Sequence, residues 1–130
     1  MKQRLLDLLA CPHCKHFPLT LKIIEQESIE VRRQYQEVLC TLYCGRFGGY
    51  VKDLTLTPAD CQTCMSIDVK VGVLGCGNCG RWFPIIDAIP HMLPDELRNE
   101  REDREFLETY KAHIPAHILM EGKPFNLSGR

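Results

Sequence analysis

The sequence lacks a long apolar run, an excess of charge of either sign and a glycine-rich nucleotide loop. Its first eleven residues become charged too soon for a secretory signal or a membrane span. Sixteen basic against seventeen acidic side chains give a formal net charge of -1, so there is no general positive field to attract phosphate backbones. Gly48, Gly49, Gly75 and Gly77 lie among cysteines, not between a strand and a helix. We therefore predict a cytoplasmic protein that meets no membrane and meets nucleic acid only indirectly.

A catalytic grouping is also missing from the sequence. His13 and His16 lie in and just after a cysteine pair, where they could replace a thiolate ligand but are not needed. His91, His113 and His117 have no serine or aspartate companion at a telling spacing. We therefore predict that the chain has no enzymatic activity of its own.

What the sequence does have is cysteine, in four close pairs with none left over. The cysteines that we predict to bind metal are Cys11, Cys14, Cys40, Cys44, Cys61, Cys64, Cys76 and Cys79. In a reducing compartment, close pairs are more often metal ligands than disulfides. Two cysteines separated by two or three residues can wrap a tight turn around one ion, so each pair supplies half of a tetrahedral site. The spacing predicts two Zn²⁺ ions, each held by four thiolates.

Four pairs can combine in three ways, and spacing alone does not choose among them. We favour a nested arrangement, in which the first and last pairs share one ion and the two middle pairs share the other, because it needs no crossed connections. The sequential and interleaved pairings remain open. Structural zinc is preferred because a site closed by four cysteines leaves no position for water or substrate, whereas a rubredoxin-like iron centre is the alternative.

Periodicity predicts few regular elements in the first half of the chain. Leucines at 5, 6, 8 and 9 favour a short helix over Lys2–Ala10, and alternation over Phe17–Ile23 favours a half-buried strand. The charged segment 25–39 fits helix and strand equally well. The segment 40–64, with three glycines and Pro58, is predicted to be a loop-rich excursion that depends on its own metal.

The second half has stronger patterns. Strict alternation of apolar residues predicts a strand over Ile67–Val73, and the apolar run over 81–94 predicts a strand at a sheet edge because its prolines cannot donate to a ladder. Asp95 is predicted to cap a solvated helix over Glu96–Glu105. An apolar stripe at helical spacing follows at Phe106, Leu107, Tyr110 and Ile114, and the tail after it is more apolar than most termini.

The apolar run after Cys79 is also the candidate docking surface. We predict that it binds a partner through Trp82, Phe83, Ile85, Ile86, Ile89, Pro90, Met92 and Leu93. About half of these side chains must fill the small core. The others would face outwards on an edge strand, which a partner could cover by adding a strand of its own.

Two stretches of the sequence carry further motifs. The first is Met1-Lys2 with Leu5-Leu6-Asp7-Leu8-Leu9-Ala10-Cys11-Pro12. The second comprises Val71-Gly72-Val73-Leu74 before Cys76, and Cys79-Gly80-Arg81-Trp82-Phe83-Pro84-Ile85-Ile86-Asp87-Ala88-Ile89-Pro90-His91-Met92-Leu93. Together they resemble the small zinc-binding activator subunit shared by tRNA, rRNA and release-factor methyltransferases. A knuckle followed by an aromatic residue, Pro-Ile and Asp-x-Ile-Pro is specific to that family, and about forty residues are covered in all.

The resemblance implies an α+β fold, a small zinc-ribbon-like antiparallel sheet with N- and C-terminal helices. Residues 1–16 and 66–97 would form the core, 17–65 an insert with the second cysteine quartet, and 98–130 a charged helix with an apolar tail. Cys11, Cys14, Cys76 and Cys79 would hold the first zinc. The edge with Ile85, Ile86, Ile89 and Pro90 would dock on a class I methyltransferase, forming a heterodimer in which the partner binds S-adenosylmethionine.

Two departures from the family pattern matter. Ala88 stands where the family commonly has glycine, and the second quartet has no counterpart that the family explains. We expect a subunit that binds, stabilises and activates a methyltransferase acting on tRNA, rRNA or a translation factor. The alternative is a zinc-ribbon module that touches nucleic acid itself in a transcription or translation complex.

Overall fold

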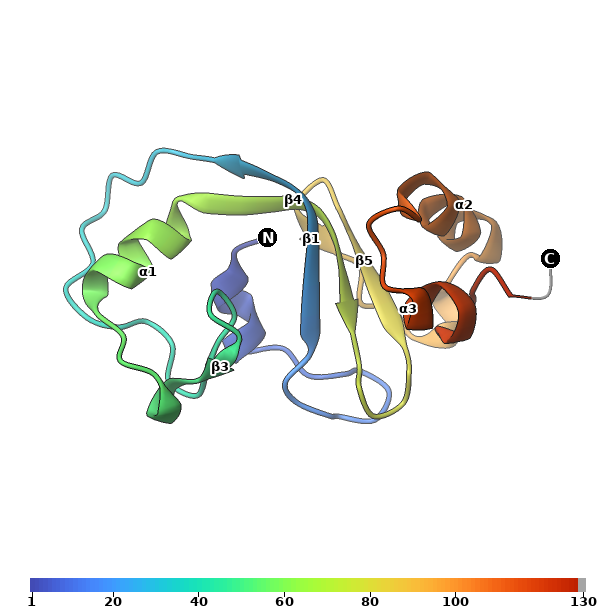
Figure 1. Cartoon of the computed structure of the whole chain (residues 1–130), viewed down its shortest axis with the longest axis horizontal. Coiled ribbons are helices and arrows are strands. Elements are labelled where there is room, and N and C mark those ends of the chain that lie inside the picture. Colours follow the sequence, from blue (N-terminus) through green and yellow to red (C-terminus); the bar gives the residue numbers. More distant parts are fainter. Residues whose placement is uncertain (129–130) are drawn as a thin grey trace.

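The computed structural model describes residues 1–128 of the chain and has an α+β fold, as predicted. Four antiparallel strands form the main sheet in the order β1-β4-β5-β6, and β2 and β3 form a separate two-stranded ribbon. Along the chain the elements are η1 (Gln3–Asp7), β1 (Thr20–Ser28), β2 (Tyr43–Cys44), β3 (Gly49–Tyr50), η2 (Val51–Asp53), α1 (Pro58–Met65), β4 (Ile67–Gly75), β5 (Trp82–Ile86), β6 (Ile89–Pro90), η3 (Asp95–Leu97), α2 (Glu100–Tyr110) and α3 (Ala116–Glu121). Figure 1 shows the sheet between two ends, with β3 and α1 at one and α2 and α3 at the other.

The main sheet separates two apolar clusters. One cluster joins η1, the segment after it and the sheet, through buried side chains that include Leu6, Leu19, Leu74, Phe83 and Ile85. The other packs the sheet against the C-terminal helices, through Val71, Val73, Trp82, Phe106, Leu107, Ile114 and Ile118. Both faces of β4 and β5 are therefore covered by the chain itself.

The strand predicted over Ile67–Val73 is confirmed as part of β4, but its side chains do not all share one face. Val69 packs in the cluster with Leu6, whereas Val71 and Val73 pack in the cluster with Trp82. The pairing of β1 with β4 contains register irregularities between Ile23 and Gln26. A bulge of this kind moves subsequent side chains to the other face, which a period of two cannot reveal.

The predicted edge strand is a hairpin whose outer strand is very short. β5 pairs with β4 on one side and β6 on the other, so Pro84 lies inside the sheet and Pro90 lies at its edge. Pro84 has no amide to donate to the ladder, whereas its carbonyl accepts from the His91 amide at 2.9 Å. Asp87 and Ala88 form the two-residue turn with φ of 50° and 67°, the left-handed pair that type I′ hairpins require.

The N-terminal segment folds as a five-residue 3-10 helix, where a longer helix was expected. η1 ends at Asp7, and its buried Leu6 anchors it to the core. The terminal ammonium of Met1 donates to the Asp68 carboxylate at 2.9 Å and to the Val69 carbonyl at 2.7 Å. These contacts fix the chain start against β4, immediately before the first cysteine pair.

The C-terminal segment departs from the predicted solvated helix. Asn99, not Asp95, caps α2, its side chain accepting from the Glu102 amide at 3.0 Å. Arg98 is buried, pairs with Asp103 at 2.8 Å and lies 4.8 Å from the Trp82 ring centroid. Within the predicted stripe Phe106, Leu107 and Ile114 are buried, and Tyr110 packs against them. The mixed charges of segment 96–105 predict a solvated surface and give no sign of this buried ion pair.

The apolar tail is a structural part of the fold. It forms α3 and then returns to the start of β5, where the Trp82 amide donates to the Lys123 carbonyl at 3.1 Å and the Trp82 indole donates to the Phe125 carbonyl at 2.8 Å. Among the residues described, no helix has the length and apolar character needed to cross a membrane.

The predicted insert contributes to the main sheet and to one end of the molecule. Its first part, β1, runs along β4 in the main sheet, whereas 29–65 leave the sheet and return through α1. The helix α1 replaces part of the predicted loop, because Thr57 and Asp60 form a capping box and Pro58 occupies the first helical position. The division of the chain into core, insert and tail stays a prediction.

Candidate metal centres and docking edge

The first and last cysteine pairs form two turns with the same backbone pattern. In the first turn the Cys11 amide donates to the His16 carbonyl at 2.9 Å, and the Lys15 amide donates to the Cys11 carbonyl at 2.8 Å. In the last turn, Cys76 makes the equivalent pair of bonds with the residues at 80 and 81, at 3.1 and 2.8 Å. Both turns therefore place two sulfurs on the same side of a tight loop.

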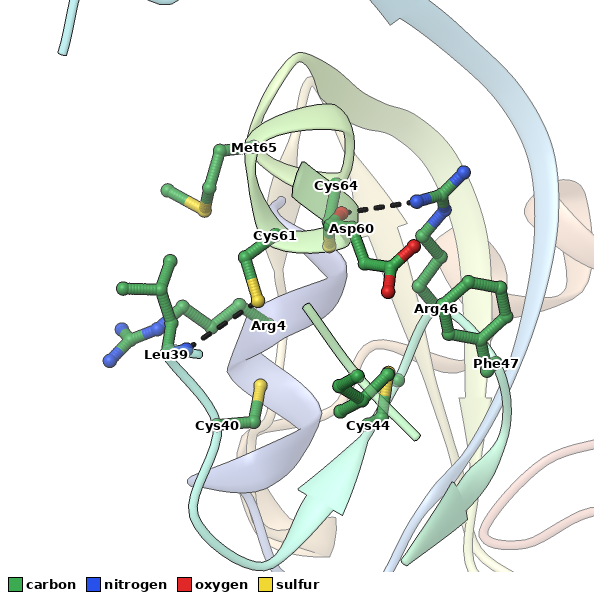
Figure 2. Close-up of a pocket in the computed structure, with 12 residues that line it drawn as sticks. Arg4, Leu39, Cys40, Cys44, Arg46, Phe47, Asp60, Cys61, Cys64 and Met65 are labelled. Atoms are coloured by element: carbon green, nitrogen blue, oxygen red, sulfur yellow. Dashed lines mark hydrogen bonds between the residues drawn. The ribbon is translucent and has the colours of Figure 1, made fainter. Parts of the chain in front are cut away.

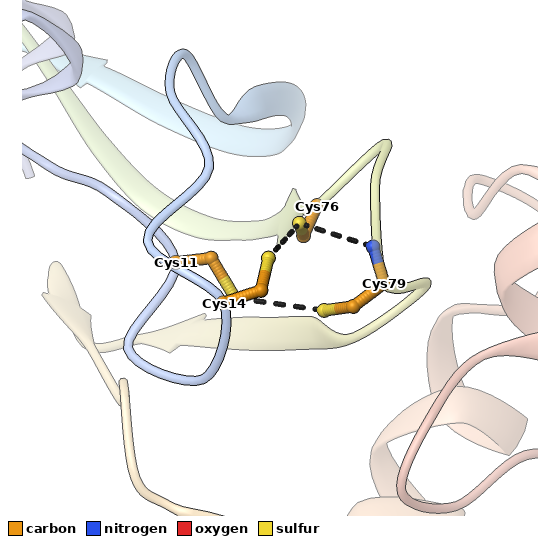
Figure 3. A group of neighbouring side chains, drawn as sticks. All are labelled: Cys11, Cys14, Cys76 and Cys79. Atoms are coloured by element: carbon orange, nitrogen blue, oxygen red, sulfur yellow. Dashed lines mark hydrogen bonds between the residues drawn. The ribbon is translucent and has the colours of Figure 1, made fainter.

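These two turns face each other across the end of the sheet (Figure 3). The Sγ atoms of Cys11, Cys14, Cys76 and Cys79 all lie within 4.8 Å of one another, with Cys11–Cys79 at 3.6 Å and Cys14–Cys76 at 3.5 Å. Four sulfurs at about 2.3 Å from a central Zn²⁺ would be about 3.8 Å apart in a tetrahedron. The four thiols of this first quartet therefore fit a tetrahedral metal, in the nested pairing.

Hydrogen bonds favour thiolates at part of the first quartet. Asn78 donates its side-chain amide to Cys14 Sγ at 3.4 Å, and this bond lowers the pKa of Cys14 to about 6. Burial raises the pKa of Cys79, but the backbone and side-chain donors of Arg81 outweigh it and lower that pKa overall. Burial raises the pKa of Cys76 to about 12. A metal must therefore displace protons from the more buried thiols on binding.

The second quartet is made of a loop and a helix end. Cys40 precedes β2 and Cys44 ends it, while Cys61 and Cys64 lie one turn apart on α1. Figure 2 shows the four side chains around one small hollow, whose wall also includes Arg4 from η1. The structure therefore brings the two middle pairs to the same hollow, although they are not as tightly gathered as the first quartet.

The second quartet has apolar surroundings that also contain two arginines, Arg4 and Arg46. Burial, together with the negative charges of Asp7 and of the other three thiols, raises the pKa of Cys40 to about 11. Arg46 donates to the Asp60 carbonyl at 3.0 Å and its charge lowers the pKa of Cys64, which burial raises. The Nε atom of Arg4 is buried without a hydrogen-bond partner. A metal held by four thiolates carries a net negative charge that these guanidinium groups could balance, so the donor set fits a metal.

Asp7 links η1 to the second quartet, and sequence spacing gave no sign of it. Its carboxylate accepts from three consecutive amides, those of Thr41 at 3.0 Å, Leu42 at 2.8 Å and Tyr43 at 2.7 Å. Burial raises the pKa of Asp7, but these backbone bonds outweigh it and the pKa is lowered. The turn between Cys40 and Cys44 is thus fixed to the core by one carboxylate.

The predicted docking residues divide into a buried and an exposed group. Trp82, Phe83 and Ile85 are at most 1% exposed and fill the two core clusters, so they are not available to a partner. Ile86, Ile89 and Leu93 are 38%, 60% and 40% exposed. Pro90 and Met92 are half-buried. We call the surface formed by Ile86, Ile89, Pro90, Met92 and Leu93 the docking edge.

Comparisons with known proteins agree with the sequence motifs. A family model described as Trm112p-like protein matches residues 2–87. Among solved structures, a chain of the E. cuniculi Mtq2–Trm112 complex, which is responsible for the methylation of the eRF1 translation termination factor, matches with a TM-score of 0.51 and 23% identity. The match covers 72% of this chain and 95% of that one. No curated protein matches. Since the family model spans well over half of the sequence, the chain belongs to the Trm112p-like protein family.

Proposed function

We propose that this chain is the non-catalytic partner of a class I, S-adenosylmethionine-dependent methyltransferase that acts on tRNA, rRNA or a translation factor. The observation that carries the proposal is the family match over 2–87, which includes both halves of the first quartet and the whole of β5. The similar E. cuniculi chain comes from a complex that methylates a translation termination factor, which supports the same role here. The thiols, all free of disulfides, suit a reducing cytoplasm.

The docking edge supplies the surface for this partnership. β6 is the last strand of the sheet, and its Ile89 side chain is 60% exposed. An exposed apolar edge strand invites another strand, and a partner that adds one removes apolar surface from water on both proteins. The buried side chains of Trp82, Phe83 and Ile85 fix the hairpin to the core. The heterodimer would thereby keep both subunits soluble and hold the methyltransferase in its active form.

The two cysteine quartets would each hold one Zn²⁺. The first would use Cys11, Cys14, Cys76 and Cys79, and the second Cys40, Cys44, Cys61 and Cys64. A bound zinc supplies a cross-link and no reaction chemistry, because four protein ligands close its coordination. At the first quartet, this cross-link joins the segment after η1 to the β4–β5 turn and so holds the hairpin that carries the docking edge.

The test is co-purification of the tagged chain from its native lysate, followed by methyl transfer with the recovered enzyme. We expect a class I methyltransferase at equal stoichiometry and a higher rate in the complex than in the enzyme alone. Ile89→Asp should abolish co-purification, because it places a charge where apolar surface is to be buried. Leu8→Asp is the matched control, since Leu8 is 64% exposed at the end of η1. Binding of the lone chain to RNA with strong salt dependence, and no methyltransferase in the eluate, would instead support the nucleic-acid-binding alternative.

A further inference from the structure

A groove of about 130 Å³ lies between the docking edge and helix α2. Its lining includes Ile86 of β5, Leu93 after β6, Leu97 of η3, and Glu102, Asp103 and Phe106 of α2. Only Pro84 and Ile86 of this lining lie within the residues 2–87 that the family model matches, and the other lining residues follow that range. The groove is therefore a joint feature of the β5–β6 hairpin and the C-terminal segment.

The groove is continuous with the docking edge. Ile86 and Leu93 belong to both surfaces, and Leu97 beside them is 63% exposed. A partner that covers Ile89 and Leu93 would thus extend over the mouth of the groove. The exposed apolar side chains of Ile86, Leu93 and Leu97 in its lining favour an apolar segment as its occupant.

The groove also carries a carboxylate that the chain does not neutralise. Asp103 is paired with the buried Arg98 at 2.8 Å, and Asp95 is paired with Arg81 at 2.6 Å. Glu102 is exposed and forms no ion pair within residues 1–128. The charged side chains that line the groove are Glu102, Asp103 and Arg98, a formal net charge of -1 with His91 neutral. A basic side chain in the occupant would complement this charge.

We propose that the groove receives an apolar segment of the methyltransferase that carries a lysine or arginine opposite Glu102. This inference rests on the proposed function and deepens it, because it names what the C-terminal segment adds to the family's docking hairpin. An apolar edge alone accepts many exposed strands, whereas a charged groove beside it selects partners with a basic residue at the matching position. The groove would therefore make the chain selective among methyltransferases.

The experiment measures the dissociation constant of the complex with the methyltransferase recovered by co-purification, for the full chain and two charge reversals. Glu102→Lys changes the groove. Glu100→Lys is the control, because Glu100 lies in the same first turn of α2 and so has the same interaction with the helix dipole, but does not line the groove. Thermal unfolding of both variants checks that α2 remains folded.

We expect Glu102→Lys to weaken binding about tenfold at low salt and Glu100→Lys to weaken it less than about twofold. The deficit of Glu102→Lys should shrink as salt is added, because part of it is screened attraction. A reversed charge at the contacting lysine or arginine of the methyltransferase should restore binding to Glu102→Lys.

Two outcomes would overturn the proposal in distinguishable ways. Equal affinities of both variants for a methyltransferase that does bind would remove the groove from the interface and leave the proposed function intact. If no methyltransferase binds the unchanged chain, both proposals fall. A lone chain that dimerises and loses its dimer with Glu102→Lys would assign the groove to a second copy and also overturn it.

Discussion

The two cysteine quartets have the same residues at nearly the same spacing, yet the fold treats them differently. The sulfurs of the first lie on two matching turns anchored at the ends of sheet strands, and all four are within 4.8 Å of one another. The second quartet joins a loop to the end of α1, outside the main sheet, and the Asp7 carboxylate ties that loop to η1. Spacing therefore predicts which residues can ligate, whereas the surrounding backbone decides how far a site is formed before metal binds.

The largest effect should come from removing one ligand of each quartet. We expect Cys11→Ser to prevent folding of the whole chain, since structural zinc contributes about 10–16 kcal/mol in small domains, as much as the stability of a typical domain. Cys61→Ser should leave the sheet folded and release 29–65 only. Trp82 is fully buried between the sheet and α2, so its fluorescence reports on the core and not on the second quartet.

Cooperative unfolding of the Cys61→Ser variant, with native tryptophan emission before the transition, would agree with this difference. If Cys61→Ser exposes Trp82 as fully as Cys11→Ser does, the two quartets stabilise one unit and the distinction between them fails.

The carboxylate of Asp7 should set how firmly the second quartet is held. Asp7→Asn keeps the size of the side chain but weakens three hydrogen bonds to backbone amides, so we expect a loss of about 1–2 kcal/mol, confined to the insert. Hydrogen exchange at 41–43 measures it directly. Since the pKa of Asp7 is lowered in the fold, its contribution is present above its unfolded pKa of about 3.9 and is lost as the pH falls further. Faster exchange throughout β4 and β5 would contradict a local role.

The smallest effect concerns one of the positions at which the two matching turns of the first quartet differ. Lys15 and Gly80 occupy equivalent positions with φ of 67° and 79°. Lys15→Gly should raise the free energy of unfolding by about 0.5–1 kcal/mol, because glycine adopts this conformation without steric cost. Gly80→Ala is the opposite test and should destabilise by a similar amount, since its added Cβ would meet nothing within 4 Å and only the backbone conformation matters. Equal stability of all three proteins in denaturant titrations would show that the turns tolerate either residue.

The sequence predicted most of the fold that depends on short-range patterns. Paired cysteines, the alternating strand before Cys76 and the apolar stripe after Glu105 all have local signals, and the structure places β4 and α2 there. These signals concern residues that share one element or one turn. The nested pairing of the cysteine pairs was one of three that spacing allows, and the first quartet gathers only because two turns distant in the sequence face each other.

What the sequence could not show depends on contacts between distant residues. The bulge that moves Val69 to the opposite face from Val71 arises from the pairing with β1. The Asp7 carboxylate accepts its three hydrogen bonds from amides about 35 residues further along the chain. Trp82 and Ile85 look as available for docking as Ile89, and only the position of the C-terminal helices and η1 decides that they are buried.

The most direct test is stepwise metal removal, followed by native mass spectrometry and hydrogen exchange on the same samples. Two zinc ions per chain should leave in separate steps as chelator is added, the first step freeing only 29–65 and the second unfolding the sheet. Release of both ions in a single step, together with exchange across the whole chain, would contradict the independence of the quartets. A freshly isolated protein without stoichiometric metal would contradict the account altogether.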